Sequence, residues 1–306
     1  MFHFNVDKRS NRLTSLIRKA PDTPTFALAN TYSLSDPEKE ALRFACLSYL
    51  WHCAHVFDKF IPVPDGSDWF GENAESISKL PNITPNGVVL PKLETMASYH
   101  FIHSIIARIM SRYFNNEVIT GIHLPVNIRL IDGRPNQKID SRPRSSTKFH
   151  SDVWAAEPSN SMAIFIPVLG DINQTTVEFI EPMDFPDDLQ RPLGDFNSGQ
   201  YISDGGIPYP GIFSEIQLVT ADALCLHRTK KNDTGFRLSI DFRVLHKTQL
   251  DSDIYLKSPR LKNYVSPGLW YGIGEKHWLV PQKSINDVIT DQVKDAYVAS
   301  FDVKET

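Results

Sequence analysis

Two histidines and one aspartate have the residue types and the spacing of a metal site. His150 and Asp152 stand two residues apart in the run 148–154, which reads as a β-strand, so their side chains are expected on the same face. His227 closes the apolar run 224–227 much further along the chain. Two imidazoles and one carboxylate form the facial triad that holds Fe(II) from one side and leaves the other side open. A His-x-Asp pair alone is a weak signal, but the three residues together predict a metal-binding and catalytic site.

A second polar set follows in a stretch that alternates between apolar and polar residues. The apolar positions are Phe236, Leu238, Ile240 and Phe242, and the polar positions are Arg237, Ser239, Asp241 and Arg243. This period of two predicts a strand with one face in a hydrophobic core. Arg237 lies ten residues after His227, so its guanidinium and the Ser239 hydroxyl are expected beside the second histidine. The planar guanidinium of arginine is suited to binding a carboxylate through two hydrogen bonds.

The order His-x-Asp, distal His, then Arg-x-Ser resembles the Fe(II)/2-oxoglutarate-dependent dioxygenases. The runs FHSDVWAAEP at 149–158 and HRTKKNDTGFRLSIDFR at 227–243 resemble more narrowly a StrG-like, phytanoyl-CoA-hydroxylase-like branch of that superfamily. The resemblance covers roughly residues 121–245.

The resemblance implies a cofactor, a co-substrate and a reaction. Fe(II) would be bound by the triad, and the far carboxylate of 2-oxoglutarate by Arg237 with help from Ser239. Arg243, on the same face, is the second candidate for this clamp. O₂ would then oxidise a small polar metabolite or natural-product intermediate, with release of succinate and CO₂. A carboxylate at position 152 favours hydroxylation, desaturation or cyclisation over halogenation.

Other polar and aromatic residues could border the same site. Asn127 and Arg129 share one face of the strand expected over 124–132, where they could line a cofactor cavity or form an ordinary solvated face. Trp154 would share the inward face of His150 and Asp152 if that strand continues. The candidate substrate contacts are Trp154, Tyr201, Tyr209 and Arg243.

The elements around these residues suggest a single domain over 1–306. Residues 1–120 read as an N-terminal arm, irregular and solvated over 1–34, followed by buttressing helices over about 37–60 and 91–114 with a long loop between them. Residues 121–250 carry about seven short strands, which predict a mainly β fold with flanking helices and a double-stranded β-helix core, the jelly roll of cupin-like proteins.

Two further segments complete this plan. Within 121–250, the Pro- and Gly-rich stretch 183–213 reads as a lid-like insertion. Residues 251–306 form a C-terminal extension with a terminal helix over about 284–301.

The composition and the charge of the chain limit the kinds of molecule that it is expected to bind. A net charge of −4 argues against nucleic acid, and no apolar run is long enough to cross a membrane. Three cysteines without metal-site spacing are typical of a reducing cytosol, so a cytoplasmic enzyme with a small-molecule substrate is expected. Two alternatives stay open: a cupin-like metal-dependent isomerase or epimerase with no redox step, and a non-catalytic jelly-roll binding protein.

Overall fold

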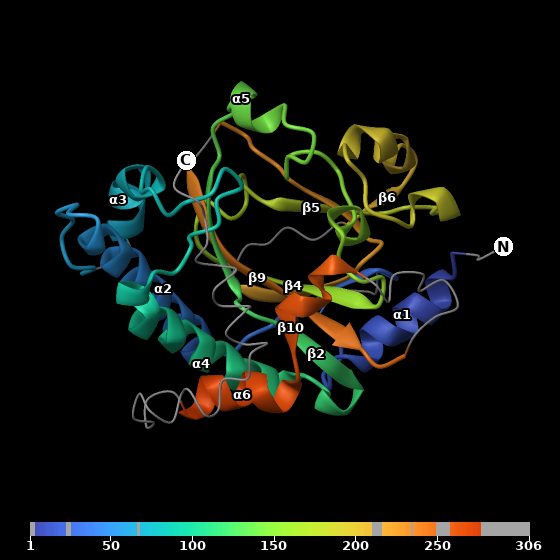
Figure 1. The fold of residues 1–306 in the computed structure, drawn as a ribbon, viewed down its shortest axis with the longest axis horizontal. Coiled ribbons are helices and arrows are strands. Elements are labelled where there is room, and N and C mark those ends of the chain that lie inside the picture. The colour runs from blue at the N-terminus through green and yellow to red at the C-terminus, as the bar shows by residue number, and fades with distance from the viewer. Residues whose placement is uncertain are drawn as a thin grey trace.

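The computed structural model describes residues 4–22, 26–65, 68–209, 216–233, 235–248 and 258–276, which form two antiparallel sheets with flanking helices (Figure 1). The larger sheet has the order β1 (Ala29–Ser33), β7 (Gln217–Asp222), β4 (Ser161–Gly170), β9 (Phe236–His246), β2 (Ile119–His123), β10 (Tyr264–Val265), and β3 (Asn127–Asp132) also pairs with β9. The smaller sheet has the order β6 (Ile207–Pro208), β5 (Val177–Glu181), β8 (Leu226–Thr229).

Strand β9 is the centre of the larger sheet. It pairs with β4 along one edge, and with β3 and then β2 along the other. Its alternation has the predicted consequence: Leu238, Ile240 and Phe242 are buried in the main hydrophobic core. The polar residues between them therefore face the opposite side of the sheet, toward the smaller sheet.

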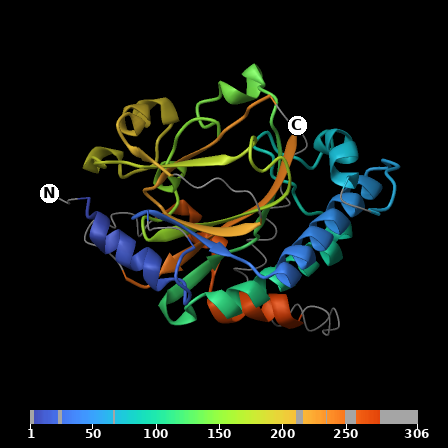
Figure 2. The ribbon, with the colours of Figure 1, turned by 180° about the vertical axis from the view of Figure 1, so that it is seen from behind.

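Helices cover the apolar face of the larger sheet. Figures 1 and 2 show α2 (Asp36–Val56), α4 (Met96–Tyr113) and α6 (Pro267–Lys276) as one layer along this side. Helix α2 begins with the capping box of Ser35 and Glu38, as the sequence predicts. No helix in the described residues is long and apolar enough to span a membrane.

The N-terminal region differs from the solvated arm expected over 1–34. Residues Val6–Ser15 form helix α1, and its basic residues Arg9 and Arg12 are buried rather than solvated. Both donate to the buried Asp222 on β7, at 2.8 Å and 3.1 Å, and both also reach the Ser159 carbonyl. The basic residues therefore anchor α1 to the larger sheet.

Two segments expected as long loops are ordered. The stretch between the first two long helices contains α3 (Trp69–Ser78), whose Trp69 and Phe70 join the main core. The described part of 183–213 contains the 3₁₀ helices Asp187–Leu189 and Phe196–Ser203. Its apolar side chains pack into a second hydrophobic core, so the segment is an integral part of the fold. The terminal helix expected over 284–301 lies outside the described residues.

Candidate active site

A short backbone pairing brings the two candidate histidines together. His150 and His227 form an antiparallel bridge in which each backbone N–H donates to the other residue's carbonyl, at 3.0 Å and 2.9 Å. Their imidazole ring centroids lie 4.4 Å apart. The two rings are therefore placed by backbone hydrogen bonds between β8 and the segment before Asp152.

Asp152 joins them by a route that the sequence pattern did not predict. The strand expected over 148–154 is wrong: only His150 is paired, through the isolated bridge, and Asp152 begins the 3₁₀ helix Asp152–Ala155, which Ser151 caps. Its backbone N–H donates to the Ala223 carbonyl at 3.0 Å, a contact that draws the chain out of the extended conformation. Oδ1 of Asp152 nevertheless lies 3.8 Å from Nε2 of His227.

The bend also removes Trp154 from the site, so its expected place beside His150 is wrong. Trp154 is fully buried in the second core, and its indole N–H donates to the Leu189 carbonyl at 2.9 Å. The flat apolar wall at His150 is instead Phe196, whose ring stacks at 4.7 Å with an interplanar angle of 2°. No sequence signal marks Phe196, because a tertiary contact brings it back to the site from a segment without regular periodicity.

Hydrogen bonding fixes both imidazoles in the tautomer that can bind a metal. Nδ1 of His150 lies 2.8 Å from the Lys148 carbonyl, and Nδ1 of His227 lies 3.2 Å from the Cys225 carbonyl. A carbonyl only accepts, so each Nδ1 carries the proton and each Nε2 keeps its lone pair. Burial lowers the pKa of both histidines, that of His150 to about 3, so both rings are neutral at pH 7.

Two imidazole nitrogens and one carboxylate are donor types that a divalent metal accepts, and the state of the Asp152 carboxylate decides whether it can serve as one of them. Burial alone would raise the pKa of this carboxyl, but Arg243 and the two imidazoles outweigh burial and lower the pKa to about 2. In the described part of the chain, no three His, Cys, Asp or Glu side chains stand close enough to hold a metal ion as they are. Arg243 donates a hydrogen bond to each carboxylate oxygen of Asp152. Each oxygen has two lone pairs, so the carboxylate can accept these hydrogen bonds and still bind a metal.

Arg237 and Ser239 lie on β9 as the alternation predicts, and both are buried. Arg237 donates from Nη1 to the Thr175 carbonyl at 2.9 Å, and its guanidinium lies over the Phe165 ring. Among the described residues no carboxylate pairs with it, and neither its Nε nor the Ser239 hydroxyl has a hydrogen-bond partner. Burial and the nearby Arg129 lower the pKa of Arg237 to about 9. The attraction of the nearby Asp241 is too weak to offset these two effects, so a buried cation without a directly paired carboxylate is costly, and an anionic ligand would lower that cost.

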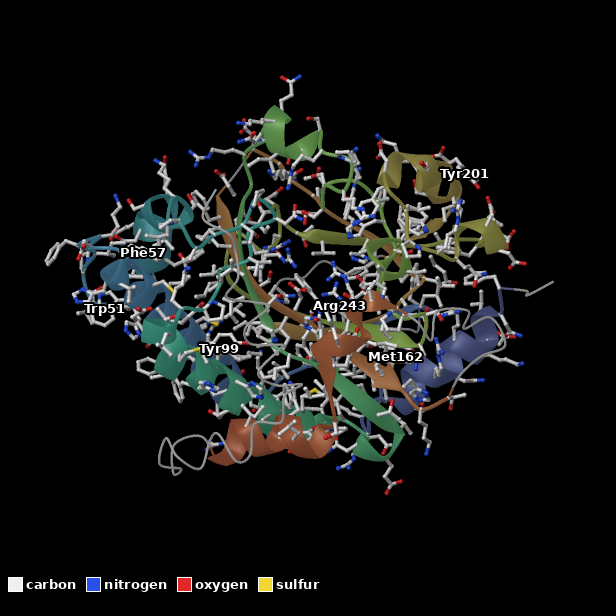
Figure 3. The ribbon with its side chains drawn as sticks, in the orientation of Figure 1. Trp51, Phe57, Tyr99, Met162, Tyr201 and Arg243 are labelled. Carbon is white, nitrogen blue, oxygen red and sulfur yellow. The ribbon has the colours of Figure 1, made fainter. Side chains whose placement is uncertain are left out.

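Asn127 and Arg129 reach the site but are already engaged. On β3 they lie opposite Asp241 and Ser239 of β9. Asn127 donates from Nδ2 to Asp241 at 3.1 Å, and Arg129 donates from Nε to Asp241 at 2.8 Å. Arg243 is engaged too, since it binds Asp241 as well as Asp152; Figure 3 shows it in the middle of the molecule.

The two candidate tyrosines lie away from these residues. Tyr201 is 56% exposed and lies at the outer rim of the molecule (Figure 3). Tyr209 donates from its hydroxyl to Thr31 at 3.1 Å and packs its ring against Phe26 and Phe179. Neither lines the cavity described next, so the structure does not bring either to the site.

One cavity of about 550 Å³ is lined by most of the polar residues of the site, although Ser239 is not among its lining residues. His150, Asp152, His227 and Arg237 line it together, although they come from β8, β9 and the bridged segment. Six arginines and three carboxylates contribute to its wall, which is therefore net positive with neutral histidines. Such a cavity favours an anionic ligand.

Comparisons with known proteins give distant structural neighbours. No protein-family model matches the chain, and no curated protein matches it significantly. SnoK, a non-heme alpha-ketoglutarate-dependent carbocyclase from nogalamycin biosynthesis, is 11% identical with a TM-score of 0.43 over 78% of this chain and 83% of that chain. SnoN, a non-heme alpha-ketoglutarate-dependent epimerase from nogalamycin biosynthesis, is 13% identical with a TM-score of 0.39, over 78% and 82% of the two chains.

A further neighbour is the non-heme monooxygenase ThoJ, which is 13% identical with a TM-score of 0.35, over 98% of this chain and 100% of that chain. At these identities and TM-scores, the likeness is too remote to transfer a reaction or a substrate.

Proposed function

We propose that the protein is a non-heme Fe(II)- and 2-oxoglutarate-dependent oxygenase that hydroxylates, desaturates or cyclises a small polar metabolite or natural-product intermediate. The observation that carries this proposal is the buried Arg237, which has no acidic partner among the described residues and lines the same cavity as His150, Asp152 and His227. A metal-only enzyme has no need of such a group, whereas a dicarboxylate co-substrate supplies its missing counter-ion.

Each residue of the site has a role in this function. His150 and His227 would bind Fe(II) through Nε2, and Asp152 through its carboxylate. Arg237 and Ser239 would bind the far carboxylate of 2-oxoglutarate. With both groups bound, the site would use O₂ to oxidise the substrate, releasing succinate and CO₂. Phe196 keeps the His150 ring in place and excludes water from one of its faces.

The arrangement of the strands supports a double-stranded β-helix as the core of the fold. The metal residues come from the side of the smaller sheet, and the carboxylate clamp comes from β9 of the larger sheet. Two facing antiparallel sheets with a site between them are what a double-stranded β-helix of the cupin type requires. This arrangement supports our proposal that the core is a double-stranded β-helix.

The decisive experiment is an anaerobic titration of the Fe(II)-loaded protein with 2-oxoglutarate. A visible charge-transfer band should develop only when the co-substrate is added, and admission of O₂ should then yield succinate. Arg237→Met should lose the band at concentrations that saturate the wild type. Arg260→Met is the matched control, because Arg260 lines the same cavity but pairs with Glu157 at 3.2 Å.

The same titration separates the alternatives. A cupin-like isomerase or epimerase without a redox step would bind the metal, but 2-oxoglutarate would give no band and no succinate would form. A non-catalytic binding protein would retain no divalent metal at His150, Asp152 and His227. Screening of metabolite pools for a mass gain that requires both O₂ and 2-oxoglutarate would then identify the substrate.

A further inference from the structure

Arg243 holds the carboxylate of Asp152 with two parallel hydrogen bonds. Its Nε lies 3.0 Å from Oδ2, and its Nη2 lies 2.8 Å from Oδ1. Two such bonds fix the position of a carboxylate and also the orientation of its plane. Without them, the Asp152 side chain could rotate in the cavity, because the 3₁₀ helix fixes only its backbone.

Arg243 is itself held from behind. Its Nη1 donates to Oδ1 of Asp241 at 2.6 Å, and Asp241 accepts from Arg129 and Asn127 on the neighbouring strand β3. The four charged side chains alternate in sign, from Arg129 through Asp241 and Arg243 to Asp152, and all four are largely buried. A buried, hydrogen-bonded chain of this kind rigidifies the last group in it.

We propose that Arg243 is a positioning residue that presents the carboxylate of Asp152 to the metal, and that Asp241 and Arg129 keep Arg243 in place. This inference rests on the proposed function, because it takes Asp152 to be a metal ligand. It also replaces the expected roles of Arg243 as a substrate contact or a second clamp: both ends of its guanidinium are occupied by carboxylates of the protein.

The sign of one measurement separates positioning from a simple charge effect. Removing a positive charge beside a cation site should tighten metal binding if Arg243 acts only through its charge. Removing a group that orients a ligand should weaken metal binding, and outer partners of metal ligands typically contribute about 10- to 100-fold in affinity. The two explanations therefore predict opposite effects for the same substitution.

The test is a Co(II) titration of the metal-free protein, followed by the visible absorption of the bound ion. We expect Arg243→Met to weaken Co(II) binding by about 10-fold or more. Arg243→Lys should also weaken it, because an ammonium keeps the charge but cannot hold both oxygens in one plane. Arg260→Met removes the same charge from the cavity wall, and Arg260 forms its ion pair with Glu157 and not with a metal residue, so this variant should bind Co(II) at least as tightly as the wild type.

Each outcome has one meaning. Unchanged or tighter binding by both Arg243 variants would overturn the positioning role while leaving the metal site intact. If Arg243→Met does not fold, as judged by circular dichroism, Arg243→Lys decides alone: wild-type affinity refutes positioning, and weaker binding supports it. If the wild type does not bind Co(II), or if His227→Ala binds it equally well, the metal site of the proposed function fails first.

Discussion

Replacement of Arg237 by methionine should make the ligand-free protein more stable and at the same time abolish its response to 2-oxoglutarate. The reason is that Arg237 is buried and charged without an acidic partner in the described part of the chain. Methionine fills a similar volume without a charge, so the variant avoids the cost of desolvating the guanidinium. Greater stability with lost binding is the mark of a residue retained for a ligand.

The magnitude follows from the perturbed pKa. Lowering the pKa of Arg237 to about 9 corresponds, at about 1.4 kcal/mol for each pKa unit, to an unfavourable folding contribution on the order of 5 kcal/mol. Loss of its hydrogen bond leaves the Thr175 carbonyl without this donor, which costs about 1–3 kcal/mol. The free energy of unfolding should therefore rise by about 2–4 kcal/mol in Arg237→Met.

The pH dependence of this difference has a definite sign. The pKa of Arg237 is lower in the folded state than in the unfolded state, so the wild type carries the full cost at any pH below about 9. Above that pH the folded protein can release the proton, and the cost diminishes. The stability advantage of Arg237→Met should accordingly be constant near neutral pH and shrink as the pH rises beyond about 9.

Urea unfolding with and without 2-oxoglutarate is the assay. At 100 times its dissociation constant, the co-substrate should stabilise the metal-loaded wild type by about 2.7 kcal/mol and should not stabilise the variant. The reasoning is refuted if Arg237→Met is less stable than the wild type in the absence of ligand. It is equally refuted if the variant keeps the full stabilisation by 2-oxoglutarate.

Three further outcomes are expected. His227→Ala should abolish succinate formation and divalent-metal binding, and full succinate production would mean that the triad is misassigned. Asp222→Asn should lower the free energy of unfolding, measured in urea, by about 3 kcal/mol or more, because it leaves Arg9 and Arg12 buried without their carboxylate. The pKa of Asp222 is lowered in the folded protein, so the wild type should lose this stabilisation as the pH falls through that pKa. If the stability of the wild type and of the variant fell identically at acid pH, the role of Asp222 would be contradicted. Gly199→Ala should lower the melting temperature, since an added Cβ would lie 2.2 Å from the Trp154 ring; an unchanged melting temperature would show that the second core yields easily.

The parts of the fold that depend on local periodicity were predictable from the sequence. The alternation over β9 assigns Leu238 and Phe242 to the core and Arg237 to the opposite face, and the structure has this arrangement. The capping box of Ser35 and Glu38 places the start of α2 for the same reason: its hydrogen bonds join residues three apart in the chain.

The parts that depend on distant contacts were not predictable. The segment at Asp152 bends because its backbone N–H finds the carbonyl of Ala223, and no spacing in the sequence encodes that partner. Arg9 and Arg12 read as solvated because the carboxylate that buries them, Asp222, lies on a strand far along the chain. Phe196 stacks on His150 from the second core, again across a long separation.

Strand β9 links the geometry of the cavity to the packing of the hydrophobic core, because it contributes residues to both. Its successive residues belong alternately to the packed helix side and to the polar side, so a shift by one position against β4 would bury Arg237 and Arg243 beneath the helices and turn Leu238 and Phe242 into the cavity. Such a misregistered sheet would lose its packing and its chemistry together. The packing of the apolar residues of β9 against the helices thus fixes the positions of the guanidinium groups on its other face. A mutation that loosens this packing should therefore also disturb the positions of Arg237 and Arg243 in the cavity.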